Sequence, residues 1–481
     1  MDSLAPALAA SSPRLSPPPT PLSSLLIHGC VLALWLLLFA ASFRLGGVLG
    51  WGVGIAYIIY DTVLLLFVGW QARDLLRAPA PQPPAHQRAT LGVIVAAYNE
   101  AAVLPATLEA LLRQTDAPDR ILIADDGSDD GTARLLTQAY GLQPAFPDQA
   151  TASGDRYPAL RWLRLPHGGK ARALNAAALQ LDTQIVLTVD ADTLLEPGAI
   201  AAFRRAFAAE PELVAATGVL TPVCGNARGA RTLQWFQTYE YIRNFLSRYA
   251  WMRVDSLLLI SGAFAGFRRE ALLAVGGFDP ECLVEDYELI HRLRRHAQSH
   301  GRHWTFRVLG GAQARTDAPA TIPAFLRQRR RWFGGFLQTQ YWYRSLVGDR
   351  RYGLLGTLML PVKAVDTLQP LYGLTAFGLL LTYLLRGQLS VLAPVSALIG
   401  AKIAVDIAYH LASVRLYRRW VGDDHRASFG AALLAALAEP FTFQLLRHSG
   451  AALGWWAFLA GRDHWGRQTR QGALEAAESD A

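Results

Sequence analysis

The sequence predicts an α/β domain that is inserted between transmembrane helices at the two ends of the chain. Of the 481 residues, 52% are hydrophobic and only 17% are charged, and the mean hydropathy is +0.19. This balance is too apolar for a wholly soluble protein and indicates membrane segments. The long apolar stretches lie near the two ends, whereas residues 90–349 alternate between strand-like and helix-like segments.

The N-terminal part is predicted to contain a lead and two spans. Residues 1–21 are rich in Pro, Ser and Ala and are expected to be disordered. Residues 22–43 are almost wholly apolar and can cross about 30 Å of hydrocarbon. The lead lacks the basic start of a signal peptide, so we expect this span to be retained. With a second span at residues 51–70, residues 22–73 form two predicted transmembrane helices.

Arginines beside the apolar segments predict the orientation in the membrane. They are Arg73, Arg77, Arg88, Arg415, Arg418 and Arg419. Because such residues mark the cytoplasmic side, residues 88–349 and both chain ends are expected in the cytoplasm, and the protein in the bacterial inner membrane. Anionic lipid explains the formal net charge of +8, so no nucleic-acid partner is predicted.

The C-terminal part is predicted to return to the membrane. Residues 350–363 contain a short apolar stretch bounded by Arg351 and Pro361, which indicates a helix lying at the interface. Residues 364–461 form the predicted C-terminal transmembrane region, and residues 462–481 a cytoplasmic tail.

Within that region the expected spans are Val365–Leu385 and Leu389–Leu411. Two further apolar stretches, Phe429–Leu446 and Ala451–Gly461, are interrupted at Glu439-Pro440 and again at residues 447–450. These interruptions predict a hairpin or a re-entrant pair.

Polar residues inside the spans have two possible roles. Lys402, Asp406 and His410 recur every four residues, so they share one face of a helix. Such residues either pair within a helix bundle or line a polar path, and Asp61 in the second span has the same alternatives.

Between the spans the sequence predicts a mostly parallel sheet. Apolar runs at residues 92–97, 120–124 and 185–189 indicate buried strands. They alternate with the predicted helices 102–113, 132–140 and 170–181 through short links. No GxGxxG follows the first strand, which argues against a dinucleotide-binding oxidoreductase. Three scattered cysteines suggest neither a zinc site nor a disulfide framework.

Asp190 and Asp192 follow the third predicted strand directly. Ligands of open α/β sheets bind at the carboxyl ends of strands, and residues two apart in a strand face the same side. Two such close carboxylates repel each other unless a cation lies between them. Mg²⁺ or Mn²⁺ carrying a diphosphate would suit the pair, although aspartates are also common where strands end.

Two further motifs precede predicted helices. Asp125 and Asp126, in DDGSDDGT, either accept hydrogen bonds from a nucleoside or form a turn. In HGGK, the glycines allow close approach of a ligand and Lys170 adds a charge at a helix start. A pyrophosphate would fit there; a flexible loop is the alternative.

Two motifs suggest chemistry on the acceptor side. Glu285 and Asp286 precede a predicted helix, where acids are also common for electrostatic reasons, and a carboxylate there can act as a general base. Gln328, Arg331 and Trp332 belong to QRRRW, which either binds ligand groups or forms a basic membrane-surface helix.

Seven motifs occur in order over about residues 90–335: VIVAAYNE, DDGSDDGT, HGGKARALNAA, VDAD, SGAFAGFRREAL, GGFDPECLVEDYEL and QRRRW. Together they resemble the membrane-integrated family 2 glycosyltransferases, which include cellulose, hyaluronan, chitin-oligosaccharide and poly-N-acetylglucosamine synthases. The resemblance implies a GT-A-like fold for residues 88–349. The chain departs from the common pattern in VEDYEL, where Thr before ED and Asp in place of Glu288 are commoner.

The resemblance also implies roles for single residues. Asp126, with Asp125 beside it, would bind the nucleoside of a UDP-sugar, and Lys170 its diphosphate. Asp190 and Asp192 would form the metal-binding DxD pair, and Asp286 would be the catalytic base. The residues implied for the acceptor and the diphosphate are Glu285, Gln328, Arg331 and Trp332.

The function implied is inverting, Mg²⁺- or Mn²⁺-dependent transfer from a UDP-sugar to a growing β-linked polysaccharide at the bilayer, with coupled export left open. One alternative is a single transfer to a lipid acceptor. Another is a transporter with a nucleotide-sensing domain, which would need more spans and internal repeats. The sequence specifies neither the donor sugar nor the linkage.

Overall fold

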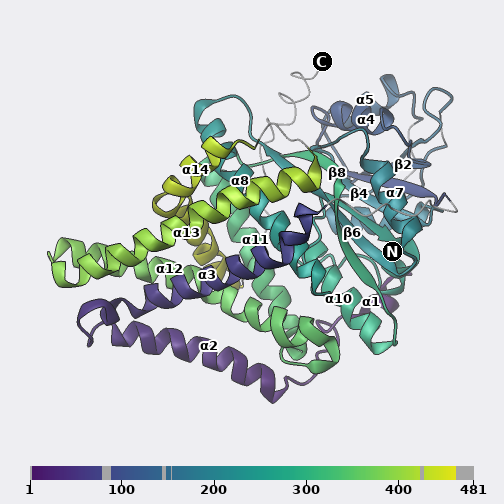
Figure 1. Cartoon of the computed structure of the whole chain (residues 1–481). Helices are drawn as coiled ribbons and strands as arrows, with labels where there is room; N and C mark the ends of the chain where they lie inside the picture. Colours follow the sequence, from purple (N-terminus) through teal and green to yellow (C-terminus); the bar gives the residue numbers. More distant parts are fainter. Residues whose placement is uncertain (1–2, 78–87, 144–147, 153, 423–426, 462–481) are drawn as a thin grey trace.

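A mixed β-sheet forms the core of the structure, a computed structural model that describes residues 3–77, 88–143, 148–152, 154–422 and 427–461. The sheet has eight strands in the order β3-β2-β1-β4-β7-β6-β8-β5. Long apolar helices from both ends of the chain gather to one side of it (Figure 1). This arrangement confirms an α/β domain inserted between groups of apolar helices. The predicted tail at 462–481 lies outside the described residues.

The first half of the sheet is parallel, as predicted. Its strands are β1 (Leu91–Ala97), β2 (Arg120–Asp125), β3 (Leu160–Arg164) and β4 (Ile185–Asp190). Three of them coincide with the predicted apolar runs. We did not predict β3, because the arginines in its LRWLR sequence interrupt the apolar pattern.

The second half of the sheet adds antiparallel pairings to the mostly parallel arrangement that the sequence predicts. Its strands are β5 (Thr193–Leu195), β6 (Leu213–Val223), β7 (Phe264–Arg268) and β8 (Thr305–Asp317). β7 is antiparallel to both β4 and β6, and β5 is antiparallel to β8, whereas β6 and β8 are parallel. Apolar periodicity identifies a strand but not its direction, so the sequence pattern could not reveal this reversal.

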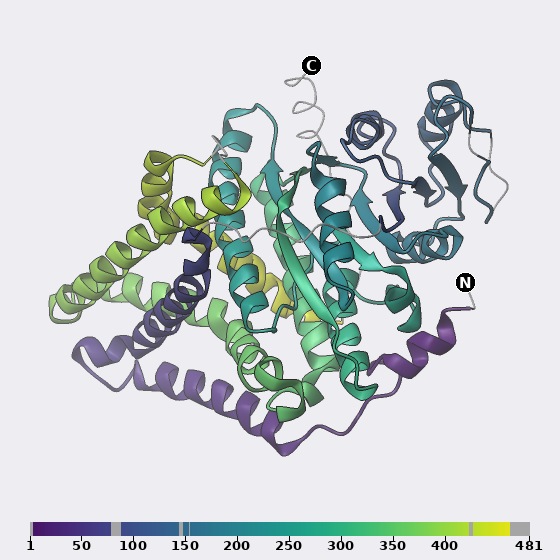
Figure 2. The same ribbon diagram turned by 45° about the vertical axis from the view of Figure 1, so that its right-hand side comes forward.

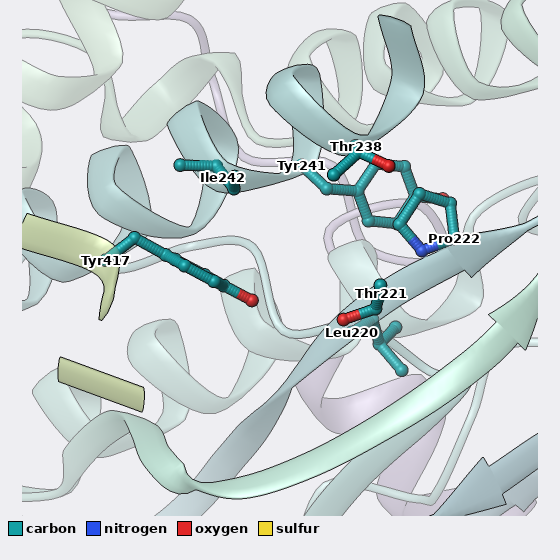
Figure 3. Close-up of a pocket in the computed structure, with 7 residues that line it drawn as sticks. All are labelled: Leu220, Thr221, Pro222, Thr238, Tyr241, Ile242 and Tyr417. Atoms are coloured by element: carbon teal, nitrogen blue, oxygen red, sulfur yellow. The ribbon is translucent and has the colours of Figure 1, made fainter. Parts of the chain in front are cut away.

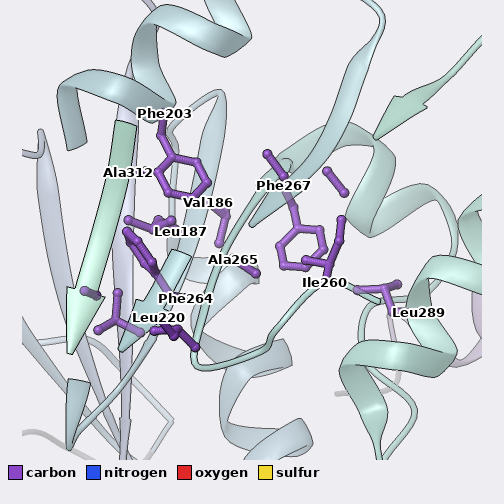
Figure 4. Packing of buried hydrophobic residues seen from close by; sticks show 14 of the residues in the cluster. Val186, Leu187, Phe203, Leu220, Ile260, Phe264, Ala265, Phe267, Leu289 and Ala312 are labelled. Atoms are coloured by element: carbon purple, nitrogen blue, oxygen red, sulfur yellow. The ribbon is translucent and has the colours of Figure 1, made fainter. Parts of the chain in front are cut away.

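Aromatic rings fill the centre of the sheet domain (Figure 4). Phe203 and Phe264 meet edge to face with their ring centroids 5.1 Å apart. Two strand glycines make room for them: a Cβ at Gly218 would lie 2.0 Å from the ring of Phe264, and one at Gly266 would lie 2.7 Å from that of Phe203. The close approach of these rings to the strands therefore requires glycine.

Helices connect and cover the strands. They are α4 (Leu104–Leu112), α5 (Thr132–Gln138), α6 (Lys170–Gln180), α7 (Ala199–Ala209), α8 (Arg228–Arg253), α9 (Arg269–Ala274), α10 (Glu285–Ser299) and α11 (Ile322–Trp342). The first three coincide with the helices that the sequence predicts. The long α8 and α11 connect the sheet domain to the apolar helices.

The lead at residues 1–21, expected to be disordered, contains an ordered helix, so that expectation is corrected for the described residues. Helix α1 (Ala5–Ser11) contacts α10, and Figure 2 shows it beside the sheet domain, away from the next helix. Arg14 donates to both oxygens of the fully buried Asp279, at 2.9 Å each. This ion pair gives a Pro- and Ser-rich segment a fixed docking point.

Within the described part of the chain, four helices are long and apolar enough to cross a membrane. They are built from α2 (Leu22–Ala41), α3 (Gly52–Ala72), α12 (Leu360–Leu385) and α13 (Leu389–Val421), and they coincide with the predicted spans. Helices α14 (Phe429–Ala438) and α15 (Phe443–Leu459) form a further pair, which is bent by 50° at its break.

Two details of the C-terminal region differ from expectation. The predicted interfacial helix at 350–363 is not separate from α12. A π turn at Leu355–Met359 continues directly into α12, and Pro361 lies in the first turn of that helix and does not end it. The interruption expected at 447–450 is absent as well, since these residues lie inside α15. Arg447 is tolerated there because Glu240 and Glu439 accept hydrogen bonds from it or pair with it.

Candidate functional site

A cavity of about 1460 Å³ extends from the carboxyl edge of the sheet to the membrane helices. All but one of the predicted site residues line it: Asp126, Lys170, Asp190, Asp192, Glu285, Asp286, Gln328, Arg331 and Trp332. The cavity continues past Asp61 of α3 and past Lys363, Asp366 and Gln369 of α12. The fold therefore brings residues more than 200 positions apart to one space.

Lys170 connects two groups of carboxylates at the centre of the cavity. It is the first residue of α6, and its Nζ lies 2.5 Å from Oδ1 of Asp190 and 3.7 Å from Oε1 of Glu285. Burial alone would lower the pKa of Lys170, but the two carboxylates raise it overall, so the ammonium stays charged. Lys170 is therefore a fixed positive charge where the sequence predicts an anionic ligand.

Asp192 is buried beside Asp190. Burial and the neighbouring carboxylates of Asp190 and Asp317 raise its pKa well above the usual value. In the part of the chain that the structure describes, no group of three or more His, Cys, Asp or Glu residues is placed to hold a metal ion. The aspartate pair could supply two oxygen ligands, and further ligands would have to come from a bound substrate or water.

Asp125 is the predicted site residue that the structure does not bring to the cavity. Its side chain is fully buried, where it accepts hydrogen bonds from the Ser128 N–H at 2.9 Å and from Trp162 Nε1 at 3.2 Å. Both bonds stabilise the turn after β2 and its contact with β3. Of the two roles that the sequence left open, Asp125 therefore has the turn-forming one.

Asp126 faces the other way and holds the HGGK loop. Its two carboxylate oxygens accept hydrogen bonds from the N–H groups of Gly168 and Gly169, at 2.8 and 2.9 Å. Gly169 has a φ of 94°, which favours glycine at this position. Tyr98 stacks on His167 of the same loop, with ring centroids 4.2 Å apart. These contacts fix the loop immediately before Lys170.

Asp286 is oriented by a backbone contact that we did not predict from the sequence. Its Oδ2 accepts a hydrogen bond from the N–H of Gly262 at 2.7 Å, and its Oδ1 accepts one from the N–H of Tyr287 at 2.8 Å. A Cβ at Gly262 would lie 2.9 Å from that of Asp286. The glycine in the SGA sequence was the available signal, since close backbone approach requires one.

Glu285, the neighbour of Asp286, is buried at the start of α10. Burial raises its pKa, the positive charges of Lys170 and Arg331 oppose this shift, and the charge of Asp286 adds to it. Glu285 therefore acts in the structure mainly as the second partner of Lys170.

Helix α11 places the QRRRW residues against the cavity. Gln328 is 7% exposed, and its Oε1 has no hydrogen-bond partner among the described residues. Arg331 donates to the carbonyl of Leu283 at 3.3 Å. Trp332 packs against the guanidinium of Arg329, whose carbon lies 4.5 Å from the ring centroid. One face of the helix thus presents three different polar or aromatic groups.

Glu240 anchors this arrangement and was also missed in the sequence. It lies on α8, is 1% exposed, and accepts hydrogen bonds from Arg329 at 2.7 Å and pairs with Arg447 at 3.1 Å. One carboxylate therefore joins α8, α11 and α15. In the sequence, Glu240 is one polar residue among several in this helix, and nothing specific indicates its role.

The polar residues of the membrane helices divide into two groups. Lys402 pairs with Asp61 at 2.7 Å and with Asp406, and His410 contacts Glu439 at 3.3 Å. For Lys402, Asp406 and His410 the pairing interpretation is therefore correct. Lys363 and Asp366 also pair, 2.7 Å apart, and both line the cavity, as Asp61 does.

A second recess between β6, α8 and α13 has a volume of only about 10 Å³ (Figure 3). Tyr417 and Tyr241 approach it from different helices. It holds no more than a water molecule, so it is not the functional site.

The part of the chain that carries this cavity matches known proteins. Residues 92–276 match the model of Glycosyl transferase family 2, and residues 185–399 match that of Glycosyl transferase family group 2. Poly-β-1,6-N-acetyl-D-glucosamine synthase of Staphylococcus epidermidis is 28% identical over 248 residues, which is 51% of this chain and 54% of that protein. The synthase of Staphylococcus aureus strain COL is 27% identical over 245 residues, 50% of this chain and 53% of that protein. The match thus spans about half the length of these relatives.

The fold is also found in a solved structure. A mannosyltransferase from Pyrobaculum calidifontis, in complex with GDP-mannose and Mn²⁺, superimposes with a TM-score of 0.53 at 22% identity. The match covers 82% of this chain and 99% of that one. The likeness establishes a GT-A-like fold for the sheet domain.

We predict that Glu240→Gln lowers the thermal stability and loosens Trp332. Removing one partner of a buried ion pair costs about 3 kcal/mol, because the remaining charge stays desolvated. The apparent Tm in detergent should fall, and the ¹⁹F resonance of 5-fluorotryptophan at Trp332, identified by its loss in Trp332→Phe, should shift. Glu109→Gln, which removes an exposed helix pair, should change neither. An unmoved resonance would show that Glu240 does not hold Trp332.

Proposed function

The chain belongs to glycosyl transferase family 2, and from this premise we propose that it transfers a sugar from a UDP-sugar to a growing β-linked polysaccharide. The observation that carries the proposal is the shared cavity. Lys170, Asp190 and Asp192 line it at the edge of the sheet, and Asp286, Arg331 and Trp332 line it from the other side. A donor and an acceptor could therefore meet within one cavity.

The proposed reaction is a single displacement with inversion. Asp286 accepts the proton of an acceptor hydroxyl, whose oxygen then forms a bond to the anomeric carbon of the donor sugar. The bond from that carbon to the diphosphate breaks, and the electron pair leaves with UDP. Lys170 and Arg331 stabilise the charge that develops on the diphosphate. The N–H of Gly262 orients the carboxylate of Asp286.

A divalent cation fits the carboxylate pair on the donor side. Asp190 and Asp192 both line the cavity and offer the hard oxygen atoms that Mg²⁺ and Mn²⁺ prefer, with phosphate oxygens completing the ligand set. We propose that these two residues hold the cation. When bound, it would supply Lewis-acid stabilisation of the diphosphate. The Mn²⁺ in the mannosyltransferase with the same fold supports this assignment.

We propose UDP-N-acetylglucosamine as the first donor to test and a β-linked N-acetylglucosamine polymer as the product. The relatives from the two staphylococci carry this activity in their names. A specific observation supports a lipid acceptor as the second candidate: Leu64, Leu65 and Val362 of the membrane helices line the same cavity. A labelled polymer or one labelled lipid would distinguish the two.

We predict that Asp286→Asn abolishes transfer while UDP still binds. Removing a general base slows transfer by roughly 100- to 10,000-fold, whereas donor contacts should remain. Incorporation of radiolabelled sugar by purified protein measures the first effect, and calorimetry with UDP measures the second. Glu109→Asn should leave both unchanged. Equal loss of UDP affinity would instead make Asp286 a donor ligand.

Removal of divalent cations should stop transfer reversibly. EDTA should abolish incorporation, and added Mn²⁺ or Mg²⁺ should restore it, because the diphosphate would lose its main counter-charge. Asp192→Asn should lower transfer roughly 100-fold or more even with added metal. Undiminished turnover in EDTA, with no metal found by elemental analysis, would contradict the assignment.

We further propose that the sheet domain is cytoplasmic and that the product leaves through the membrane part of the cavity. In a Cys30→Ser background, a cysteine at the exposed Gln388 should react with an impermeant maleimide on intact cells. A cysteine at the exposed Arg205 should react only after permeabilisation. This orientation is expected because the arginines that flank the spans mark their cytoplasmic ends. Labelling of residue 205 on intact cells, with residue 388 protected, would overturn it.

A further inference from the structure

Arg248 of α8 is a half-buried cation for which the described residues provide no hydrogen bond. Its Nε and Nη1 are inaccessible and unpartnered, although the side chain lines the large cavity. Six other cavity-lining cations are held by carboxylates or carbonyls, and two more, Arg327 and Arg330, are exposed to solvent. The six are Lys170, Arg243, Arg329, Arg331, Lys363 and Arg447. Arg248 belongs to none of the seven motifs in the sequence, and it differs from these six cations in having no hydrogen-bond partner among the described residues.

A desolvated guanidinium without partners is costly to the fold. Burial lowers the pKa of Arg248 to about 10, so it still carries its charge at neutral pH. The ring of Phe245 lies 4.4 Å from the guanidinium carbon and supports one face of it. Buried polar groups in native proteins are almost always hydrogen-bonded, so an orphaned guanidinium beside a cavity indicates a ligand group.

Among the described residues, Gln328 has a hydrogen-bond acceptor without a partner, whereas Arg248 has donors without partners. Its Oε1 is buried and has no partner in the described part of the chain, and it lines the same cavity from α11. Arg248 can only donate hydrogen bonds, whereas the Oε1 of Gln328 can only accept them. A hydroxyl group both donates and accepts, so a ligand that is rich in hydroxyls would satisfy both residues.

The neighbouring carboxylate of Asp286 favours an uncharged ligand beside Arg248. Asp286 and Glu285 are carboxylates, and Asp286 contributes favourably to the electrostatics of Arg248. A phosphate or carboxylate entering here would be repelled by both acids. Aromatic rings of Tyr241 and Trp332 also line the cavity and offer apolar faces for the carbon atoms of a sugar ring.

We propose that Arg248 and Gln328 form an acceptor subsite that binds an uncharged saccharide through its hydroxyl groups, next to Asp286. The proposal rests on the proposed function, because it assumes that Asp286 acts on an acceptor hydroxyl. Arg248 is the new element of the subsite and a binding residue for the acceptor, not for the nucleotide. Its unpaired charge lowers the stability of the ligand-free protein, because its hydrogen bonds form only when the acceptor is bound.

Binding without turnover tests the subsite. The probe is a short β-1,6-linked N-acetylglucosamine oligosaccharide, titrated into purified full-length protein with UDP present. Arg248→Met should raise the Kd of the oligosaccharide at least tenfold and leave the Kd of UDP unchanged. Because the substitution removes an unpaired buried charge, the apparent Tm should stay equal or rise. Arg248→Lys, which keeps the charge but loses the forked geometry, should restore part of the affinity.

Two variants on the same helix serve as controls. Arg253 is half-exposed, pairs with Asp74 and does not line the cavity, so Arg253→Met should change neither affinity. Arg243 lines the cavity but pairs with Glu439 at 2.6 Å, so Arg243→Met should lower the Tm by stranding that carboxylate. The contrast in Tm separates a ligand-binding arginine from a structural one.

Three outcomes would overturn the proposal: an unchanged oligosaccharide Kd in Arg248→Met, a parallel rise in the Kd of UDP, or no binding of the oligosaccharide by the wild type. Failure of the proposed function looks different. Wild-type protein that binds the oligosaccharide, and loses this binding in Arg248→Met, but transfers no sugar from any UDP-sugar would keep the subsite and reject the transfer reaction.

Discussion

Repulsion between carboxylates is the constraint on which the cavity depends. Asp190 and Asp192 end one strand, Glu285 and Asp286 begin a helix nearly a hundred residues later, and all four line one space. Such a cluster would drive the two segments apart unless cations lay among them. Lys170 bridges the groups through Asp190 and Glu285, so the approach of α10 to the edge of the sheet depends on one ammonium. The same charge is then available to a diphosphate, which makes the structural and the proposed chemical roles of Lys170 inseparable.

A second charge centre connects the sheet domain to the membrane helices. Glu240 joins Arg329 and Arg447, and Arg329 in turn supports Trp332. Each of these residues is expensive to bury alone, and the network is stable because every charge has a partner. Arg248, on the same helix as Glu240, lacks such a partner. The contrast within one helix separates charges that hold the fold together from a charge that is kept for a ligand.

Backbone groups set the positions of the acids as much as ion pairs do. The N–H of Gly262 reaches Asp286 only because no side chain intervenes, and the N–H groups of Gly168 and Gly169 hold both carboxylate oxygens of Asp126. Hydrogen bonds to backbone groups are rigid, since the backbone is fixed by the sheet and by the helix start. The acids of the cavity are therefore oriented before any substrate binds, which lowers the entropy cost of reaching a reactive geometry.

Local periodicity in the sequence determined the apolar spans, the strands β1, β2 and β4, and the acids at their ends, because burial on both faces of a strand and immersion in lipid leave continuous apolar runs. All but one of the site residues that the seven motifs identified line the cavity. Only the tertiary structure decided that Asp125 faces the core while its neighbour Asp126 faces the cavity, since a single turn separates the two directions. It also decided the reversal of β7, the docking of residues 3–21, and the roles of Glu240, Gly262 and Arg248. Those features depend on partners that are distant in the sequence, and a pairing between distant residues leaves no local pattern.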